Sequence, residues 1–378
     1  MVCKKDKCTG CFACYNICPK NAIEMIVDDY GYLYPKVNKE KCVNCKMCEK
    51  VCPSINMPIF RKPVKVFAMA AKNEEVRLQS SSGGAATVFA ENIIKNNGIV
   101  YGCAYSKGCH IQHIRINKIE DLDKLKGSKY VHSYVLDTFR QVKKDLNEGL
   151  TVLYIGTPCK IAGLRNYVKK CNNDKLYLVD LVCHGVPSQK YLSDSLYDKN
   201  EDNVIFRVKN NFVLKETNED GFVLKETSAE DSFYYRAFFE ALTYRENCYT
   251  CNYAKSDRCS DLTIGDFWGL GEDSKFYKDK EKGVSVLLVN TEKGKKLIEI
   301  ASKEILIEER SLEEAKKKNG QLNRPKEINK NYYKFQKLYI KYGFNKAYRK
   351  INKYRLFKNR LKKNKLINNL YKKIIRRG

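Results

Sequence analysis

The apolar and polar positions divide the chain into an N-terminal stretch without long apolar runs and a body of alternating strand and helix patterns. Apolar runs of strand length, or runs with period-two alternation, occupy residues 64–71, 99–105, 110–116, 151–156, 175–183, 262–269 and 284–290. Helical patterns occupy residues 85–96, 136–146 and 294–305, and another helix is expected from Lys160. This succession predicts an α/β (α+β) body with a mixed sheet.

We expect four units from this pattern: a small cysteine-rich unit at 1–57, two parts of the body at 64–147 and 148–320, and a tail at 321–378. The prolines that bound residues 58–63 disfavour helix and predict a linker. In the tail, apolar pairs recur at helical spacing among many lysines: Leu338 with Tyr342, Leu366 with Leu370, and Tyr371 with Ile375. We therefore expect a basic amphipathic helix there.

A six-residue segment, FVLKET, occurs twice, at residues 212–217 and 222–227. The residues between the copies include Asp220-Gly221, a pair that favours a tight turn. The repeat predicts a β-hairpin insertion.

The net charge of +27 is concentrated in the tail, which holds 19 Lys or Arg and one acidic residue from Lys326 onward. Such a run is either a solvated face or a contact for an anionic membrane surface, and nucleic acid is the less favoured partner. No apolar run reaches 18 residues, and the first residues lack the apolar stretch of a signal peptide. We expect a cytoplasmic protein, with peripheral contact at the inner membrane face as a further possibility.

Eight of the 17 cysteines form two identical motifs, each C-x2-C-x2-C-x3-C-P. This is the bacterial dicluster ferredoxin spacing, in which the fourth cysteine of each motif ligates the other cluster. One 4Fe–4S cluster is thus assigned to Cys8, Cys11, Cys14 and Cys52, and the other to Cys42, Cys45, Cys48 and Cys18. Zinc sites commonly use two separated pairs, which fits this pattern poorly. Cysteine grouped in this way favours metal ligation in a reducing compartment, and the cluster load suits an anaerobe.

Four further motifs lie in the body. Ser80 to Gly84 precedes a helix, where backbone amides bind phosphate or a plain helix cap forms. Gly156 to Lys160 and Val182 to Pro187 each close an apolar strand, and ligands bind at such ends in open α/β sheets. Cys248-x2-Cys251 supplies half of a metal site, with Cys259 close behind it.

Four segments in this order resemble the coenzyme F420 hydrogenase/dehydrogenase beta-subunit family: GSKYVHS (127–133), GTPCKIAGL (156–164), LVCHGVPS (181–188) and CYTCNYAKSDRCSDLTIGDFWG (248–269). The resemblance runs from about Val64 to about Ile307 and implies an iron–sulfur flavoprotein oxidoreductase that contains FAD. It implies a third 4Fe–4S cluster, whose expected ligands are Cys159, Cys183, Cys248 and Cys251, with Cys259 as a competitor.

The resemblance also suggests residues for the flavin: Ser81, Ser82, Gly83, Gly84, Lys129 and Thr157. The catalytic residue is unknown, and the candidates are Lys129, Lys160 and His184. The alternative interpretation of Lys129 and Lys160 is that both are solvated surface lysines. The alternative for His184 is a structural role. Asp266 and Trp268 suit packing near the cluster equally well.

The expected activity is electron transfer from a partner such as ferredoxin, through the clusters to FAD, and on to a small-molecule two-electron acceptor. That acceptor is an F420-like coenzyme or a metabolite, for instance in surface-polysaccharide synthesis. The alternative is an electron-transfer adaptor subunit without its own substrate site. The substrate, the direction of flow and the oligomeric state have no signal in the sequence.

Overall fold

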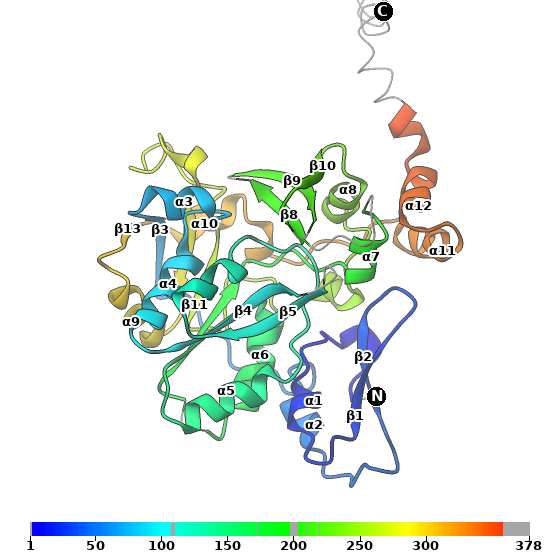
Figure 1. Cartoon of the computed structure of the whole chain (residues 1–378), viewed down its shortest axis with the longest axis horizontal. Helices are drawn as coiled ribbons and strands as arrows, with labels where there is room; N and C mark the ends of the chain where they lie inside the picture. Colours follow the sequence, from blue (N-terminus) through cyan, green and yellow to red (C-terminus); the bar gives the residue numbers. More distant parts are fainter. Residues whose placement is uncertain are drawn as a thin grey trace, which may run out of the picture.

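The computed structural model describes residues 2–106, 110–171, 173–196, 203–208, 210–218 and 220–357. Its centre is an eight-stranded sheet in the order β13-β3-β12-β11-β7-β6-β4-β5 (Figure 1). The strands are β3 (Lys65–Ala71), β4 (Ile99–Ser106), β5 (His110–Ile116), β6 (Val152–Gly156), β7 (Leu176–Leu181), β11 (Leu262–Asp266), β12 (Ser285–Val289) and β13 (Ile305–Glu309). Strands β4, β6, β7 and β11 are parallel and the outer pairs antiparallel, so the expected mixed α/β sheet is confirmed.

Alternate residues of the central strands face two apolar layers, as the period of a strand requires. Tyr101 and Tyr154 pack toward α5 (Thr138–Asn147) and α6 (Pro158–Tyr167). Val100 and Leu153 pack toward α4 (Ala85–Lys95) and α9 (Glu292–Ile300) on the other face. The sheet is therefore covered on both faces, and the carboxyl ends of its parallel strands meet at one edge.

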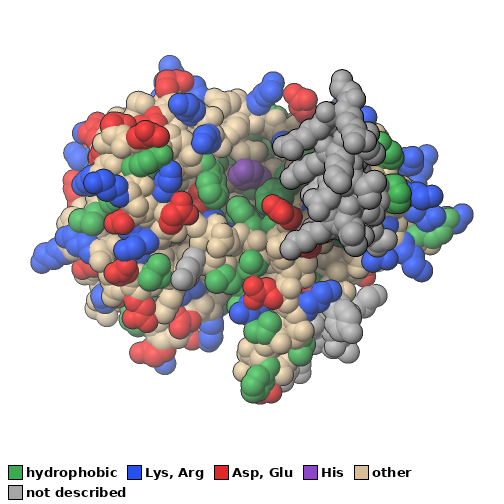
Figure 2. Space-filling model, turned by 90° about the horizontal axis from the view of Figure 1, so that it is seen from above, with side chains coloured by type: hydrophobic (Ala, Val, Ile, Leu, Met, Phe, Trp, Pro, Cys, Tyr) green, Lys and Arg blue, Asp and Glu red, His purple; other side chains and the backbone are tan. Residues whose placement is uncertain are grey.

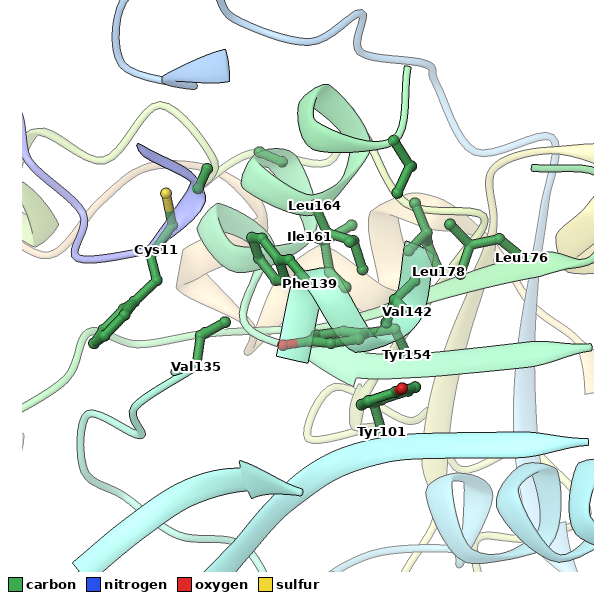
Figure 3. Close-up of a cluster of buried hydrophobic side chains, with 14 of the residues drawn as sticks. Cys11, Tyr101, Val135, Phe139, Val142, Tyr154, Ile161, Leu164, Leu176 and Leu178 are labelled. Carbon is green, nitrogen blue, oxygen red and sulfur yellow. The ribbon is translucent and has the colours of Figure 1, made fainter. Parts of the chain in front are cut away.

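The N-terminal unit contains a two-stranded antiparallel sheet and two short helices. They are β1 (Ile23–Val27), β2 (Leu33–Val37), α1 (Ala13–Ile17) and α2 (Met47–Val51), preceded by the 3-10 helix η1 (Lys5–Lys7). This unit is continuous with the body, since Cys11, Phe12 and Ala13 share an apolar core with Phe139 and Ile161. In Figure 3, Cys11 lies beside the helix that carries Ile161 and Leu164.

The predicted hairpin is confirmed. Residues of the repeat form β9 (Asn211–Thr217) and β10 (Val223–Ser228), which pair antiparallel in a three-stranded sheet with β8 (Asn203–Val208). The two copies pair with each other, so that Lys215 lies opposite Glu226 and Glu216 opposite Lys225. The repeat thus places opposite charges across the strand pair, which stabilises the insertion.

Several helix boundaries differ from the predictions. The helix expected at 136–146 begins at Thr138, because Leu136 has a left-handed backbone with φ of 52°. The helix expected at 294–305 begins two residues earlier, where the Thr291 side chain caps it, and ends at Ile300. Residues 305–309 instead form β13, which pairs with β3. The short helices α3 (Glu74–Gln79), α7 (Gln189–Ser193), α8 (Phe233–Phe239) and α10 (Leu312–Lys317) had not been predicted.

The C-terminal region is helical, as expected. Helices α11 (Tyr332–Tyr342) and α12 (Phe344–Ile351) pack through Phe335, Tyr339 and Tyr348 into the same apolar cluster as Tyr191 and Tyr234. Figure 1 shows this helical pair at the side of the molecule, next to the N-terminal unit. The predicted pairs Leu366–Leu370 and Tyr371–Ile375 lie outside the described residues. Within the described part of the chain, no helix combines the length and the apolar character that crossing a membrane requires.

Candidate electron-transfer site

The four cysteines assigned to the first cluster, Cys8, Cys11, Cys14 and Cys52, line one small cavity. Cys3, which lies outside the motif, lines it too and forms hydrogen bonds with the sulfurs of Cys8 and Cys52. These hydrogen bonds lower the pKa of Cys8 to about 6 and that of Cys52 to about 7. Burial raises the pKa of Cys11 to about 12, with smaller contributions from Cys52 and Cys8. The four sulfurs thus surround a common volume, and thiolates are the ligands that a cubane requires.

A buried arginine from the body holds the backbone of the first cysteine motif. Arg245 is 0% exposed, and its Nε donates to the carbonyl oxygen of Cys8 at 2.7 Å while Nη2 donates to that of Leu33 at 3.0 Å. Its guanidinium lies over the ring of Tyr34, 4.0 Å from the centroid. The third nitrogen, Nη1, is buried without a protein partner. The carbonyl of Arg245 accepts from the amide of Cys248, so this residue joins the first cluster's loop to the body cysteines.

The two cysteine loops differ in exposure. We call residues 8–14 the first loop and residues 42–48 the second loop. The cysteines of the first loop are all buried, whereas Cys45 of the second loop is exposed and its other two cysteines are half-buried. The fourth residue of the second set, Cys18, accepts a hydrogen bond at Sγ from the amide of Ala22 at 3.2 Å. The second set therefore lies at the protein surface.

The four body cysteines named by the resemblance come together from three segments. Cys159 is on the first turn of α6, Cys183 follows β7, Cys248 lies within η3 (Glu246–Thr250), and Cys251 directly follows that helix. Burial raises the pKa of Cys183 to about 12, and the neighbouring thiols of Cys159 and Cys251 raise it as well. The pKa of Cys248 is raised in the same way, by burial and then by Cys251, Cys183 and Cys159. Every pair among the four thus interacts electrostatically.

The competing ligand, Cys259, lies elsewhere. It is 1% exposed in the apolar core beneath α6, and its sulfur contacts the carbonyl oxygen of Pro158 at 3.9 Å. Burial raises its pKa to about 12, and the nearby charged groups are Asp180, Arg258 and Arg165 rather than the other thiols. Across the described residues, no three His, Cys, Asp or Glu side chains have the spacing that a single metal ion needs.

Helix α6 brings the two buried cysteine sets side by side. Cys159 and Gly163 are one turn apart and so share a face of this helix. A β-carbon at Gly163 would lie 2.9 Å from the sulfur of Cys11 and 3.4 Å from the β-carbon of Ala13. The helix that carries a body cysteine therefore packs directly on the first loop, and glycine is what permits this approach.

A buried polar cluster lies between the same two sets. The ammonium of Lys160, which is 1% exposed, donates to the hydroxyl of Ser133, and that hydroxyl contacts Nδ1 of His113 at 3.3 Å. His132 is buried with neither ring nitrogen hydrogen-bonded to protein, and a β-carbon at Gly10 would come 3.1 Å from its ring. Burial and the Lys160 charge hold the pKa of both histidines well below the usual range. Lys160 is therefore not the solvated lysine of the alternative interpretation.

Residues predicted for the flavin have protein partners in the structure. The hydroxyl of Ser81 accepts from the amide of Ser128 at 2.8 Å, and that of Ser82 donates to the carbonyl oxygen of Val284 at 3.0 Å. A β-carbon at Gly83 would lie 2.2 Å from the carbonyl oxygen of Met69, so close packing accounts for that glycine. Gly84 adopts a left-handed backbone at the start of α4, with φ of 90°.

The remaining candidates are distributed around the same edge of the sheet. The Lys129 ammonium donates to three carbonyls at the end of η2 (Ile119–Leu125), the closest at 2.7 Å, which explains this lysine as a cap. The hydroxyl of Thr157 lies 3.4 Å from the sulfur of Cys159. Burial lowers the pKa of His184 to about 4, so the ring is neutral near pH 7. Figure 2 shows a hollow on one face of the molecule where a histidine lies among hydrophobic side chains.

Asp266 and Trp268 belong to an aromatic and ionic contact with the three-stranded sheet. Arg207 donates from Nη1 to both carboxylate oxygens of Asp266, at 3.0 and 2.9 Å. Its guanidinium lies 4.7 Å from the ring centroid of Phe212 and 5.6 Å from that of Trp268. The motif IGDFWG therefore anchors the hairpin insertion to the carboxyl end of β11.

The sequence had not indicated several residues of this site. Arg245, His132 and Gly163 contact the first loop from positions more than 100 residues away, and no local spacing marks them. Arg245 precedes the Cys248 motif by three residues, which is the sole sequence signal for it.

Comparisons with known proteins agree with the two parts of this site. Residues 7–56 match a 4Fe-4S dicluster domain, and residues 149–315 match the family model for the C terminus of the coenzyme F420 hydrogenase/dehydrogenase beta subunit. A chain from a structure of the F420-reducing [NiFe] hydrogenase complex of Methanosarcina barkeri is similar at 17% identity and a TM-score of 0.43, covering 79% of this chain and 94% of that one. No curated protein matched.

The dicluster match coincides with the two cysteine motifs, and the beta-subunit match covers all four body cysteines. The chain therefore contains an N-terminal 4Fe-4S dicluster domain and a body segment related to the C terminus of the coenzyme F420 hydrogenase/dehydrogenase beta subunit, and it is an iron–sulfur electron-transfer protein of oxidoreductase type.

Proposed function

We propose that the chain is an iron–sulfur flavoprotein that moves electrons between a ferredoxin-like protein and a small-molecule two-electron acceptor. The proposed route enters at the second cysteine set, continues at the first set and the body set, and ends at FAD. The observation that carries it is the packing of α6, which places Cys159 one turn from the contact between Gly163 and Cys11. Bound clusters and flavin would supply the one- and two-electron chemistry, and the protein their positions.

The body cysteines suit a third 4Fe–4S cluster. Four thiols from three segments interact pairwise, and they lie beyond the carboxyl ends of β6 and β7, where open α/β sheets bind cofactors. Burial raises the pKa of Cys183, Cys248 and Cys251, which keeps these three thiols protonated in the absence of iron, and ligation by iron would replace those protons. Cys159, Cys183, Cys248 and Cys251 would hold this cluster, and Cys259 would not.

The buried cations around these thiols support an electrostatic role in the proposed route. Lys160 and Arg245 are both almost fully buried, and both interact with cysteine sulfurs of the first set. Lys160 interacts with Cys159 and Cys183 of the body set as well. A cation in a low-dielectric interior offsets negative charge that a redox centre gains on reduction. We infer that Lys160 acts as a shared counter-charge between the two buried sets.

FAD is proposed from the family and from the arrangement of motifs at one edge of the sheet. The serine–glycine segment contacts the 127–133 motif through Ser81 and Ser128, and Asp266 interacts with Ser82. These motifs therefore converge near the strand ends that carry the body cysteines. The acceptor would be an F420-like coenzyme or a metabolite, for instance one of surface-polysaccharide synthesis.

The basic tail supports a second, separable proposal of peripheral contact with the cytoplasmic face of the inner membrane. Its described part exposes Tyr333, Ile340, Tyr342, Tyr354 and Phe357 among lysines and arginines. Exposed aromatic and apolar side chains beside cations suit an anionic lipid surface better than nucleic acid. Flotation with anionic liposomes, compared between the full chain and its Tyr333→Ser, Ile340→Ser variant, tests this contact, because both substituted side chains are exposed and the buried residues of α11 and α12 are retained.

Anaerobic reduction of bound flavin tests the main proposal. The Cys159→Ala variant should retain the two N-terminal clusters yet lose flavin reduction by an external one-electron donor. Flavin reduction at the wild-type rate, with all cluster signals intact, would reject the body set as part of the route. An adaptor subunit would instead contain clusters but neither bind flavin nor turn over a substrate alone.

A further inference from the structure

The two cysteine loops have the same backbone conformation. In the first loop, Gly10 and Phe12 adopt left-handed φ angles of 63° and 64°. At the equivalent positions of the second loop, Asn44 and Lys46 have φ angles of 52° and 56°. Each loop then enters a five-residue helix, α1 or α2. The two loops are thus local copies, and their side chains can be compared position by position.

The equivalent side chains lie in opposite environments. Three positions of the first loop are buried, namely Thr9, Phe12 and Ala13. The same three positions of the second loop are exposed, namely Val43, Lys46 and Met47. The first loop uses this face to pack on the body, where Phe12 and Ala13 join the apolar core of α5 and α6. The second loop presents the same face to solvent, with Val43 58% exposed.

The surroundings of the second loop are basic. Five lysines between residues 36 and 50 are exposed, and no ion pair within the described chain involves them: Lys36, Lys39, Lys41, Lys46 and Lys50. The same stretch holds two glutamates, Glu40 and Glu49. Exposed apolar side chains at the centre with charges around them are the composition of a protein-docking surface.

We propose that the second loop, with its five lysines, is the docking surface for an acidic one-electron carrier protein. Docking there would repeat, between two molecules, the contact that the first loop makes with α6 within this chain. One electron would pass from the reduced centre of the carrier to the cluster of the second set, with no bond or proton transferred. This inference rests on the proposed function and adds to it the point where electrons enter and the charge of the partner.

A charge reversal tests the docking surface. Lys39→Glu with Lys46→Glu changes two exposed lysines of this surface, and Lys296→Glu with Lys303→Glu is a matched control on α9 and the turn after it. The probe is a reduced acidic bacterial ferredoxin, mixed anaerobically with each protein in a stopped-flow instrument at several salt concentrations. Dithionite, which needs no docking surface, measures whether the clusters are present and reducible.

We expect the ferredoxin to reduce the wild type and the control rapidly at low salt and more slowly as salt rises. The Lys39/Lys46 variant should be slower by about tenfold or more at low salt and should lose most of the salt dependence. Equal rates and salt slopes in all three proteins, or no reduction by ferredoxin while dithionite reduces the clusters, would overturn the docking surface. Failure of dithionite to bleach any cluster would instead reject the proposed function itself.

Discussion

Gly163 and Cys11 lie so close together that a single added β-carbon on α6 would come within 2.9 Å of the cysteine sulfur. This contact joins an N-terminal electron-transfer unit to the body of the protein, and it occurs on the helix whose first turn carries Cys159. The two units therefore share a core and not merely a linker. Distance between redox centres sets the rate of electron transfer, so this contact is where the proposed route is most sensitive.

Enlarging Gly163 should uncouple the two units. Gly163→Leu would push the first loop away from α6, at a cost of about 1–3 kcal/mol in the free energy of unfolding. Reduction of the N-terminal clusters should persist while onward reduction of the body slows. The measurement is stopped-flow absorbance of clusters and flavin after mixing with dithionite.

Gly320→Ala is the matched control, because a β-carbon there would meet no atom within 4 Å. If Gly163→Leu transfers electrons onward as fast as this control, the contact does not lie on the route.

Replacing Arg245 should lower the midpoint potential of the first cluster. Arg245→Gln removes a buried cation and leaves the carbonyls of Cys8 and Leu33 without their donors. Each unsatisfied carbonyl should lower the free energy of unfolding by about 1–3 kcal/mol. Loss of the positive charge disfavours the reduced, more negative state. A redox titration followed by electron paramagnetic resonance separates this cluster from the second one.

Arg207→Gln removes another buried arginine, which pairs with Asp266, and serves as the control. A potential for the first cluster that is unchanged in Arg245→Gln, or shifted equally in Arg207→Gln, would count against a specific role for Arg245.

The body set and Cys259 should respond differently to alanine substitution. Cys251→Ala should reduce the iron content by up to about four atoms per chain, because a cubane contains four irons. Cys259→Ala should retain iron and lose only stability, by about 1–2 kcal/mol for a small buried side chain. Iron analysis measures the iron content of both variants, and thermal unfolding measures their stability. Iron loss in Cys259→Ala and not in Cys251→Ala would make Cys259 the ligand and Cys251 the structural residue.

Stability should fall below about pH 6.5 because of the buried histidines. Burial and Lys160 hold the pKa of His113 well below its ordinary value, so the ring stays neutral in the folded protein while the unfolded chain takes up a proton. The unfolded state then binds more protons, and the free energy of unfolding decreases as the pH falls. His113→Gln should remove up to about 1.4 kcal/mol per pH unit of this dependence.

Urea unfolding at pH 7 and pH 5 provides the measurement, with the exposed His110→Gln as the control. A pH dependence that is identical in wild type and His113→Gln would show that this ring does not contribute.

The sequence predicted the mixed sheet, most of its strands and the self-paired hairpin, because these depend on local periodicity and turn chemistry. It also grouped the eight N-terminal cysteines, since their spacing is itself the geometry of the motif. The end of α9 was missed because Ile305 continues the helical pattern, whereas pairing with β3 makes it a strand. Tertiary pairing decided this segment and local propensity did not.

The contacts around the first loop were not predictable in the same way. Arg245, His132 and Gly163 act through positions brought together by the fold. His132 and Gly163 lie within the quoted segments 127–133 and 156–164, but nothing in those segments indicates contact with the first loop. Lys129 shows the opposite case, because this lysine of the quoted segment 127–133 caps η2 through three carbonyls. The sequence motifs thus predicted which edge of the sheet, at the carboxyl ends of its parallel strands, carries the site. The structure was needed to distinguish a capping residue such as Lys129 from a residue beside the thiols such as Lys160.

Iron and flavin content after anaerobic purification tests the central claim most directly. Three cubanes and one flavin predict about 12 irons and one FAD per chain. About 8 irons without flavin would contradict the route through the body set, and would leave a dicluster unit attached to a body that serves as an adaptor.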